Sequence, residues 1–205
     1  MNTNSNTISM SPDEAIEVLR QGNLRFVNGP QQMCELEKLR IQQKDQQNPF
    51  VSILSCSDSR TPTEVVFDQS LGDIFSVRLA GNVASKEAIG SLEFSTKYLG
   101  TSLIVVMGHS SCGAIKGACD QLQDENINAI IDLIKPSVDS EASVISERNS
   151  GNEKFVALVC QKNIQHQIQT ILKQSKIISE LNAQNKIKII GAVQDLATGI
   201  VEFNS

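Results

Sequence analysis

Short, very apolar runs that end in polar residues dominate the middle of the chain. The runs 50–55 and 102–107 are rich in Val, Ile and Leu, and a cluster of polar side chains follows each one. Apolar runs of about 4–8 residues bounded by polar residues or glycine are typical of buried strands. The segments 73–79, 187–193 and 200–203 have the same character, the last two separated by a turn. The pattern therefore predicts strands at these places.

Apolar residues recur at helical spacing between these runs. Ser11 followed by Pro12 and Glu14 predicts a helix start, because Ser is a good N-cap, Pro suits the first turn and Glu closes a capping box. We expect this helix to end near residue 28. The other predicted helices are 33–45, 62–67, 86–99, 112–122, 127–134 with Pro136 as its stop, and 155–181. Strands that alternate with helices predict an α/β fold with a mostly parallel sheet flanked by helices.

The domain organisation is simple. Residues 1–10 are polar and predict a disordered tail, and residues 11–205 are long enough for one domain with a sizeable core. The second helical stretch, 33–45, is rich in Gln and charge and only weakly amphipathic. We expect the N-terminal helices to project and to pack on a partner subunit.

Composition argues against two classes of partner. The net charge is −5 with no basic cluster, and the chain has no Trp and one Tyr, which argues against binding nucleic acid. The apolar runs are far shorter than the roughly 20 residues that a membrane-spanning helix needs. The first ten residues lack the features of a signal peptide. We therefore expect a cytoplasmic protein whose thiols stay reduced.

Two thiols and an imidazole follow the ends of two predicted strands. Cys56 comes after the run 50–55, and His109 and Cys112 come after the run 102–107. In open α/β sheets, sites are built at the carboxyl ends of the strands. Two thiolates and one imidazole suit Zn²⁺, and three protein ligands leave the fourth position open, as in catalytic zinc sites.

Simpler explanations exist for each of these residues taken alone. A single Cys after a strand is commonly a small buried hydrophobe, and an H-x-x-C spacing arises by chance. A structural zinc site usually has a fourth Cys or His, but Cys34, Cys119 and Cys160 lack the close spacing to supply one. We expect those three to be core or inert thiols. The two motifs together favour a metal site.

Asp58 and Arg60 add a carboxylate and a guanidinium beside the first thiol. A carboxylate can pair with a guanidinium two residues away in a strong bidentate contact. Asp58 therefore has two alternative partners: it can bind the zinc as a fourth ligand, or it can pair with Arg60 and accept a hydrogen bond from a zinc-bound water. Zn²⁺ with two thiolates is formally neutral and acidifies its water less than a tris-imidazole zinc does.

At these residues the chain resembles the β-class carbonic anhydrases. The resemblance rests on Cys56-Ser-Asp58-Ser-Arg60 and His109-Ser-Ser-Cys112-Gly113, and it extends to the segments 73–82 and 191–199. It covers nearly the whole chain past residue 11. It implies reversible hydration of CO₂ to bicarbonate and a proton, by attack of zinc-bound hydroxide.

The resemblance also assigns roles to single residues. It implies that Cys56, His109 and Cys112 bind zinc, that Asp58 and Arg60 form the catalytic pair, and that the backbone N–H of Gly113 faces the substrate. The implied pocket wall consists of Gln47, Phe75, Ala80 and Phe94, some of them supplied by a partner subunit. The implied assembly is a homodimer or a dimer of dimers in which the N-terminal helices embrace the neighbour.

One subgroup of the family carries an inhibitory bicarbonate site built from a Trp, an Arg and a Tyr. The corresponding positions here are Ile53, Arg78 and Gln194, so only the Arg is present and we expect no allosteric bicarbonate site. Two alternatives to the leading function remain. One is hydrolysis of carbon disulfide or carbonyl sulfide on the same scaffold, and the other is a non-enzymatic zinc-thiolate binding module.

Overall fold

The computed structural model describes residues 10–29 and 36–204. Residues 1–9 of the disordered tail expected over 1–10, and the start of the helix expected at Met33, lie outside the described residues. Met10, the last residue of that expected tail, accepts a hydrogen bond at its carbonyl from Ser102 Oγ (2.6 Å).

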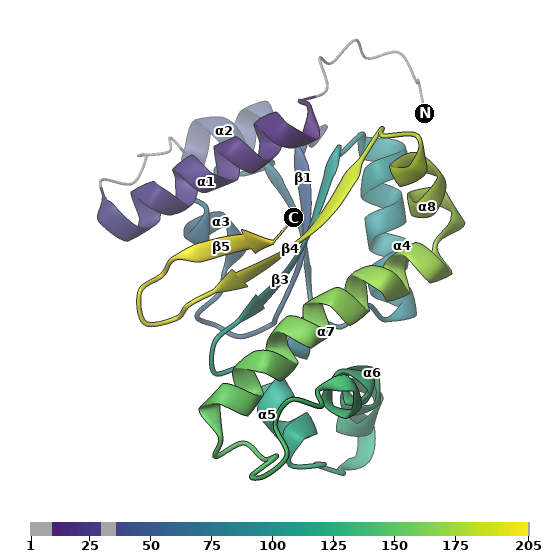
Figure 1. Ribbon diagram of the computed structural model, residues 1–205. Helices are drawn as coiled ribbons and strands as arrows, with labels where there is room; N and C mark the ends of the chain where they lie inside the picture. The colour runs from purple at the N-terminus through teal and green to yellow at the C-terminus, as the bar shows by residue number, and fades with distance from the viewer. Residues whose placement is uncertain (1–9, 30–35, 205) are drawn as a thin grey trace.

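A five-stranded sheet forms the centre of the molecule (Figure 1). Its strands are β1 (Val51–Ser55), β2 (Ile74–Arg78), β3 (Leu103–His109), β4 (Lys188–Gln194) and β5 (Val201–Asn204). The order across the sheet is β2-β1-β3-β4-β5, with β5 alone antiparallel to its neighbour. The expectation of a mostly parallel sheet flanked by helices is therefore confirmed.

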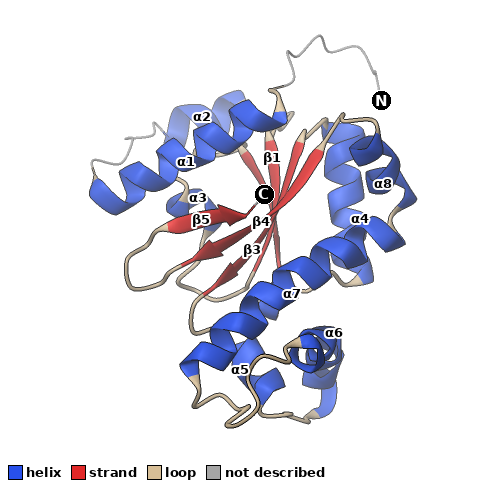
Figure 2. Ribbon diagram, viewed as in Figure 1, coloured by secondary structure: helices blue, strands red, loops and turns tan. Residues whose placement is uncertain are grey.

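Helices surround this sheet on both faces (Figure 2). They are α1 (Pro12–Asn28), α2 (Leu36–Gln42), α3 (Thr63–Val66), α4 (Lys86–Phe94), α5 (Gly113–Cys119), α6 (Asn128–Ser140), α7 (Glu153–Gln174) and α8 (Lys176–Ala183), with short helical turns at Ala80–Asn82, Ser95–Leu99 and Glu125–Ile127. One buried cluster joins the sheet to α4–α8, and a second joins it to α1 and α3. No described helix combines the length and the apolar character needed to cross a membrane.

The long helix expected over 155–181 is two helices. Ser175 ends α7 and begins α8 with extended backbone (φ −104°, ψ 105°). Its hydroxyl accepts a hydrogen bond from the Ile178 amide and donates one to Glu93 Oε1 (2.6 Å). The apolar spacing continues across this break, so the pattern alone does not reveal the cap.

The expected helix stop at Pro136 was wrong. The helix α6 continues through Pro136 to Ser140. Arg148 compensates at its end, because its guanidinium donates to the carbonyls of Val138 and Val144, each at 2.8 Å. Arg148 also donates to the carbonyl of Glu141, the residue that caps α6, so the guanidinium ties the last turn of the helix to the segment that follows it. A distant arginine therefore stabilises a helix end that a local reading places four residues earlier.

The helix α7 crosses the sheet at close range. A Cβ added at Gly108 on β3 would lie 2.9 Å from both Cys160 Sγ and Ile164 Cδ1 of α7. Only glycine at this position allows the helix to approach the strand so closely. This approach places α7 directly over the strand that ends in His109.

The two N-terminal helices behave differently. In α1, Ala15 and Leu19 are fully buried in the core of this same chain, so this helix covers one face of its own sheet. The helix α2 has no buried residue, and Leu36 and Ile41 are 57% and 56% exposed. The expectation of a projecting helix therefore fits α2 and not α1.

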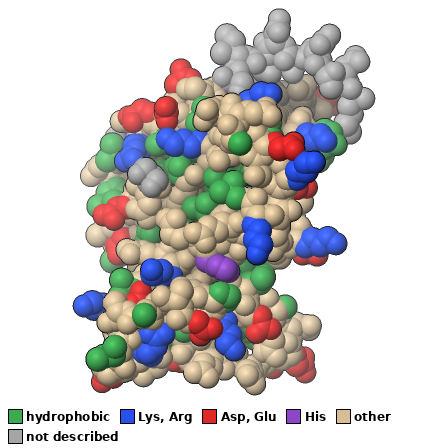
Figure 3. Space-filling view, turned by 45° about the vertical axis from the view of Figure 1, so that its right-hand side comes forward, with side chains coloured by type: hydrophobic (Ala, Val, Ile, Leu, Met, Phe, Trp, Pro, Cys, Tyr) green, Lys and Arg blue, Asp and Glu red, His purple; other side chains and the backbone are tan. Residues whose placement is uncertain are grey.

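Charged side chains of both signs are interspersed on the face drawn in Figure 3. The Lys and Arg side chains described on that face form no continuous basic stripe.

Asn23 anchors α1 to the sheet, and we predict that its amide is needed for stability. Asn23 donates to the carbonyls of Val66 and Gly199 and accepts from the Val201 amide. The substitution Asn23→Ala leaves these backbone groups buried without partners and should lower the free energy of unfolding by roughly 2–4 kcal/mol. Urea denaturation would measure the loss. Asn28→Ala, in the exposed last turn of the same helix, is the matched control, and equal losses in both variants would contradict the prediction.

Candidate metal centre

Parallel pairing of β1 and β3 brings the predicted donors to one edge of the sheet. Ser55 pairs with Met107, so Cys56 directly follows β1 close to where His109 ends β3. His109 is thus the last residue of its strand rather than the first residue after it. Cys112 lies three residues further on as the N-cap of α5. Two strand ends and one helix start therefore supply the three side chains.

The three side chains have the geometry of a metal site. Cys56, His109 and Cys112 are 5%, 1% and 1% exposed, and their ligand atoms all lie within 4.8 Å of one another. The two sulfur atoms are 3.9 Å apart. Tetrahedral zinc with Zn–S bonds of about 2.3 Å requires a sulfur separation of about 3.8 Å. The cluster therefore fits a zinc ion.

The His109 imidazole is oriented so that one ring nitrogen is free to bind a metal. His109 Nδ1 lies 2.9 Å from the carbonyl oxygen of Ser110, so the ring proton belongs on Nδ1. His109 Nε2 is buried and has no hydrogen-bond partner among the described residues. A buried nitrogen lone pair without a partner is costly unless something binds it. This orientation, with Nδ1–H on a backbone carbonyl, is common for histidines that ligate metals.

The two neighbouring thiols shift each other's pKa in opposite directions. The hydrogen bond with Cys112, together with that from the Gly81 amide, lowers the pKa of the Cys56 thiol. The same contact with Cys56, reinforced by burial, raises the pKa of Cys112 far above its ordinary value. Cys56 is therefore the more readily ionised of the two thiols, and metal binding must displace the proton on Cys112.

Asp58 pairs with Arg60 in the structure. The Arg60 side chain donates to both carboxylate oxygens, at 2.9 Å from Nε and 2.7 Å from Nη2, and the Arg60 amide adds a third bond (3.0 Å). These hydrogen bonds from Arg60 hold the pKa of Asp58 well below its usual range. Asp58 Oδ2 also lies 3.9 Å from His109 Nε2. The carboxylate is therefore ionised, fixed by Arg60 and next to the donor cluster.

Two residues that were not predicted to act at the site hold the Cys56–Asp58 segment in place. Arg78, at the end of β2, donates to the carbonyls of Cys56 (3.0 Å) and Asp58 (2.6 Å). Thr61 Oγ1 donates toward the same two carbonyls. From the sequence, Arg78 was linked only to the bicarbonate site of one family subgroup. The register of β1 with β2 places Arg78 opposite Ser55, next to Cys56, and this pairing is not evident from the sequence.

Of the five residues predicted to line the substrate pocket, two are neighbours of residues at this centre. Gly113 follows Cys112 directly, and Ala80 precedes Gly81, whose amide donates to Cys56 Sγ (3.3 Å). Phe75 on β2 and Phe94 at the end of α4 lie against each other, with ring centroids 6.4 Å apart. Gln47 is exposed in the segment before β1.

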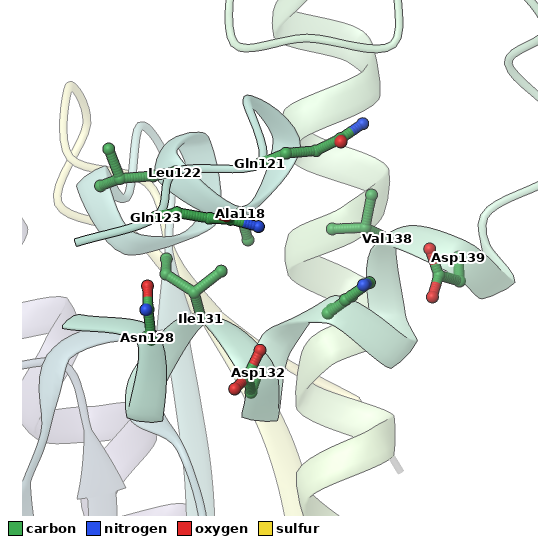
Figure 4. A pocket seen from close by; sticks show the side chains of 10 residues that line it. Ala118, Gln121, Leu122, Gln123, Asn128, Ile131, Asp132, Val138 and Asp139 are labelled. Atoms are coloured by element: carbon green, nitrogen blue, oxygen red, sulfur yellow. The ribbon is translucent and has the colours of Figure 1, made fainter. Parts of the chain in front are cut away.

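Two cavities lie near this end of the molecule. One, of about 520 Å³, borders the donor cluster and is lined in part by Arg60, His109 and Cys160. The other, of about 400 Å³, lies between the turn after α5 and the helix α6 (Figure 4). Its lining includes Asn128 and Asp132 but no cysteine or histidine, so it is separate from the metal centre.

Comparison with known proteins agrees with this geometry. The family model described as carbonic anhydrase matches residues 51–201. The chain is 33% identical over 195 residues to carbonic anhydrase 2 of Mycobacterium tuberculosis, covering 92% of this chain and 91% of the relative. It is 32% identical over 201 residues to the carbonic anhydrase of Mycolicibacterium smegmatis, covering 95% and 94%.

Solved structures share the fold. The β-carbonic anhydrase CcaA matches with a TM-score of 0.71 at 23% identity, covering 93% of this chain and 95% of the other. A tetrameric β-carbonic anhydrase from Sordaria macrospora matches with a TM-score of 0.67 at 23% identity, covering 82% and 86%. The sequence relatives, the fold and the Cys-His-Cys cluster agree, and the chain belongs to the β-class carbonic anhydrase family.

Proposed function

We propose that the protein hydrates CO₂ reversibly at a zinc ion held by Cys56, His109 and Cys112. The observation that carries the proposal is the pairing of Asp58 with Arg60 beside three converging donors. With Asp58 held by Arg60, the protein supplies three ligands and leaves a fourth position for water. Zinc in such a site supplies the activated water that reacts with CO₂ near neutral pH.

Asp58 acts as the hydrogen-bond acceptor that orients the nucleophile. Its depressed pKa keeps the carboxylate ionised throughout the neutral and alkaline range, so it always accepts and does not itself titrate there. Arg60 is a positioning residue that acts through Asp58. When that pairing breaks, the carboxylate is free to bind the metal as a fourth ligand and to close the site.

The neighbouring residues bind and enclose the substrate. The Gly113 amide faces CO₂, and Ala80 with the contacting rings of Phe75 and Phe94 forms an apolar wall that excludes water. Gln47 supplies an amide donor to the site of a partner subunit. Its exposed position in the segment before β1 supports that role.

The active assembly is a homodimer or a dimer of dimers. The exposure of Leu36 and Ile41 on α2, a helix with no buried residue in its own chain, supports a partner subunit at this surface. The related Sordaria macrospora enzymes are described as tetrameric. We also infer a cytoplasmic location, where thiols stay reduced. The four cysteines that the structure describes are all free, which supports this inference.

The first prediction is fast CO₂ hydration by protein that carries close to one zinc per chain. Activity should rise with pH through the neutral to alkaline range as the activated water ionises, since Asp58 is already ionised there. Stopped-flow hydration with parallel metal analysis measures both quantities. Full zinc with no hydration at any pH would contradict the proposal, and carbon disulfide and carbonyl sulfide would then be assayed as substrates.

The ligand assignment has a matched pair of variants. Cys112→Ser should lose zinc and activity together, because one of three ligands is removed. Cys119→Ser removes another buried thiol outside the cluster and should keep both. Equal zinc content in the two variants would disprove the assignment of Cys112.

Arg60→Ala should depress hydration at neutral pH by about tenfold or more while zinc stays bound, because it removes charge-assisted bonds to Asp58. Activity should recover in part at alkaline pH, where hydroxide competes better with a carboxylate for the metal. Arg20→Ala, on the exposed side of α1, serves as the control. Unchanged hydration in Arg60→Ala would refute the positioning role.

The assembly also has a direct test. Ile41→Lys places a charge on the exposed apolar side of α2 and should shift the protein toward monomers in light scattering after size-exclusion chromatography. Ile145→Lys makes the same change at a residue that is 92% exposed and outside the helices, and it should leave the assembly intact. An unchanged oligomer in Ile41→Lys would rule out α2 as the interface.

A further inference from the structure

A buried polar network joins α7 to the turn beside the metal centre. Asn163 and Gln167 lie one helical turn apart on α7 and are 0% and 1% exposed. Amide side chains this deeply buried require hydrogen-bond partners. Their partners are main-chain groups of Gly81 and Ala84 in this turn, together with groups of α6.

The two amides hold the turn at two points. Asn163 Nδ2 donates to the carbonyl of Gly81 (2.9 Å), and the Ala84 amide donates to Gln167 Oε1 (2.9 Å). Gln167 Nε2 then donates to Asn163 Oδ1 (2.9 Å) and to the carbonyl of Leu133 on α6 (3.0 Å). The amides therefore support each other and fix the turn against two helices.

The turn needs this external support because its central residue has no side chain. Gly81 adopts φ +69°, and an added Cβ would lie 2.6 Å from Ile134 Cδ1. Both facts require glycine at this position. Only the main chain of Gly81 is available to fix its orientation, and α7 bonds to the carbonyl of that residue.

The opposite side of Gly81 faces the metal centre. Its amide donates to Cys56 Sγ at 3.3 Å. A hydrogen bond to a ligating thiolate orients the sulfur and withdraws electron density that the metal would otherwise receive. The orientation of this one amide therefore affects both the position and the charge of a ligand.

We propose that Asn163 and Gln167 are positioning residues that hold the Gly81 amide against the Cys56 sulfur. Through Gly81 they set the electron density that Cys56 offers to the metal, although neither residue touches the donor cluster. This inference rests on the proposed role of Cys56 as a zinc ligand.

Two substitutions test the proposal with little change in volume. Asn163→Leu removes the donor to the Gly81 carbonyl, and Gln167→Met removes the acceptor for the Ala84 amide. Ser52→Ala is the matched control, because it removes buried hydroxyl bonds to Ser95 and Thr101 that have no connection to the turn. Full-length protein is used throughout.

The first readout is amide hydrogen exchange in the metal-free protein. We expect exchange at Gly81 to be slow in the wild type and about tenfold faster in either α7 variant, while amides within β1 and β3 are unchanged. Ser52→Ala should leave Gly81 unchanged. Unchanged Gly81 exchange in the variants, or an equal acceleration over the whole sheet, would overturn the proposal.

The second readout is the sulfur-to-metal charge-transfer band of the cobalt-substituted protein. Loss of the N–H···S bond leaves a more electron-rich thiolate, so the band should move to longer wavelength in both α7 variants and not in Ser52→Ala. An unmoved band would overturn the proposed effect on the ligand. A wild-type spectrum without sulfur bands would instead refute the metal ligation by cysteine, while the exchange measurement still tests the network. If Asn163→Leu does not fold, Gln167→Met gives both readouts.

Discussion

Two sulfur atoms 3.9 Å apart are the contact around which the rest of this structure is arranged. They belong to Cys56 and Cys112, which are separated by 56 positions in the chain. Such a contact forms only when β1 pairs in parallel with β3 and both strands end at the same edge. It also concentrates two thiols and an imidazole in a space with almost no access to water. Burying these groups together is costly unless protons are shared or a cation is bound.

The donor cluster can keep an open position for water only if the nearby carboxylate of Asp58 does not bind the metal. Asp58 lies close enough to His109 to compete for a metal, yet Arg60 takes both of its oxygens. Because the two residues are only two positions apart, the pairing is local and needs no contribution from the rest of the fold. Arg78 then donates to the carbonyls of Cys56 and Asp58, which anchors the segment to β2. The site thus combines a short-range pair with a long-range anchor.

The sheet and the donor cluster could be predicted because each depends on patterns within a few residues. Apolar runs indicated the strands, and Cys56, His109 and Cys112 followed two of them directly. The helix break at Ser175 could not be predicted, since the apolar spacing continues across it and its hydroxyl bonds to Glu93, 82 positions away. The sequence also did not reveal whether Asp58 pairs with Arg60 or binds the metal, because both partners are close to it. Asn163 and Gln167 bind main-chain groups near residue 81, which no side-chain pattern reveals.

The separation of the donors also determines when the centre can exist. In a small zinc finger the ligands are close in sequence, and the ion itself drives folding. Here Cys56 and His109 meet only after the chain between them has formed α3, β2 and α4 and has returned to the sheet as β3. No short segment of the chain carries all three donors, so the centre is a property of the folded sheet and not of any local sequence motif.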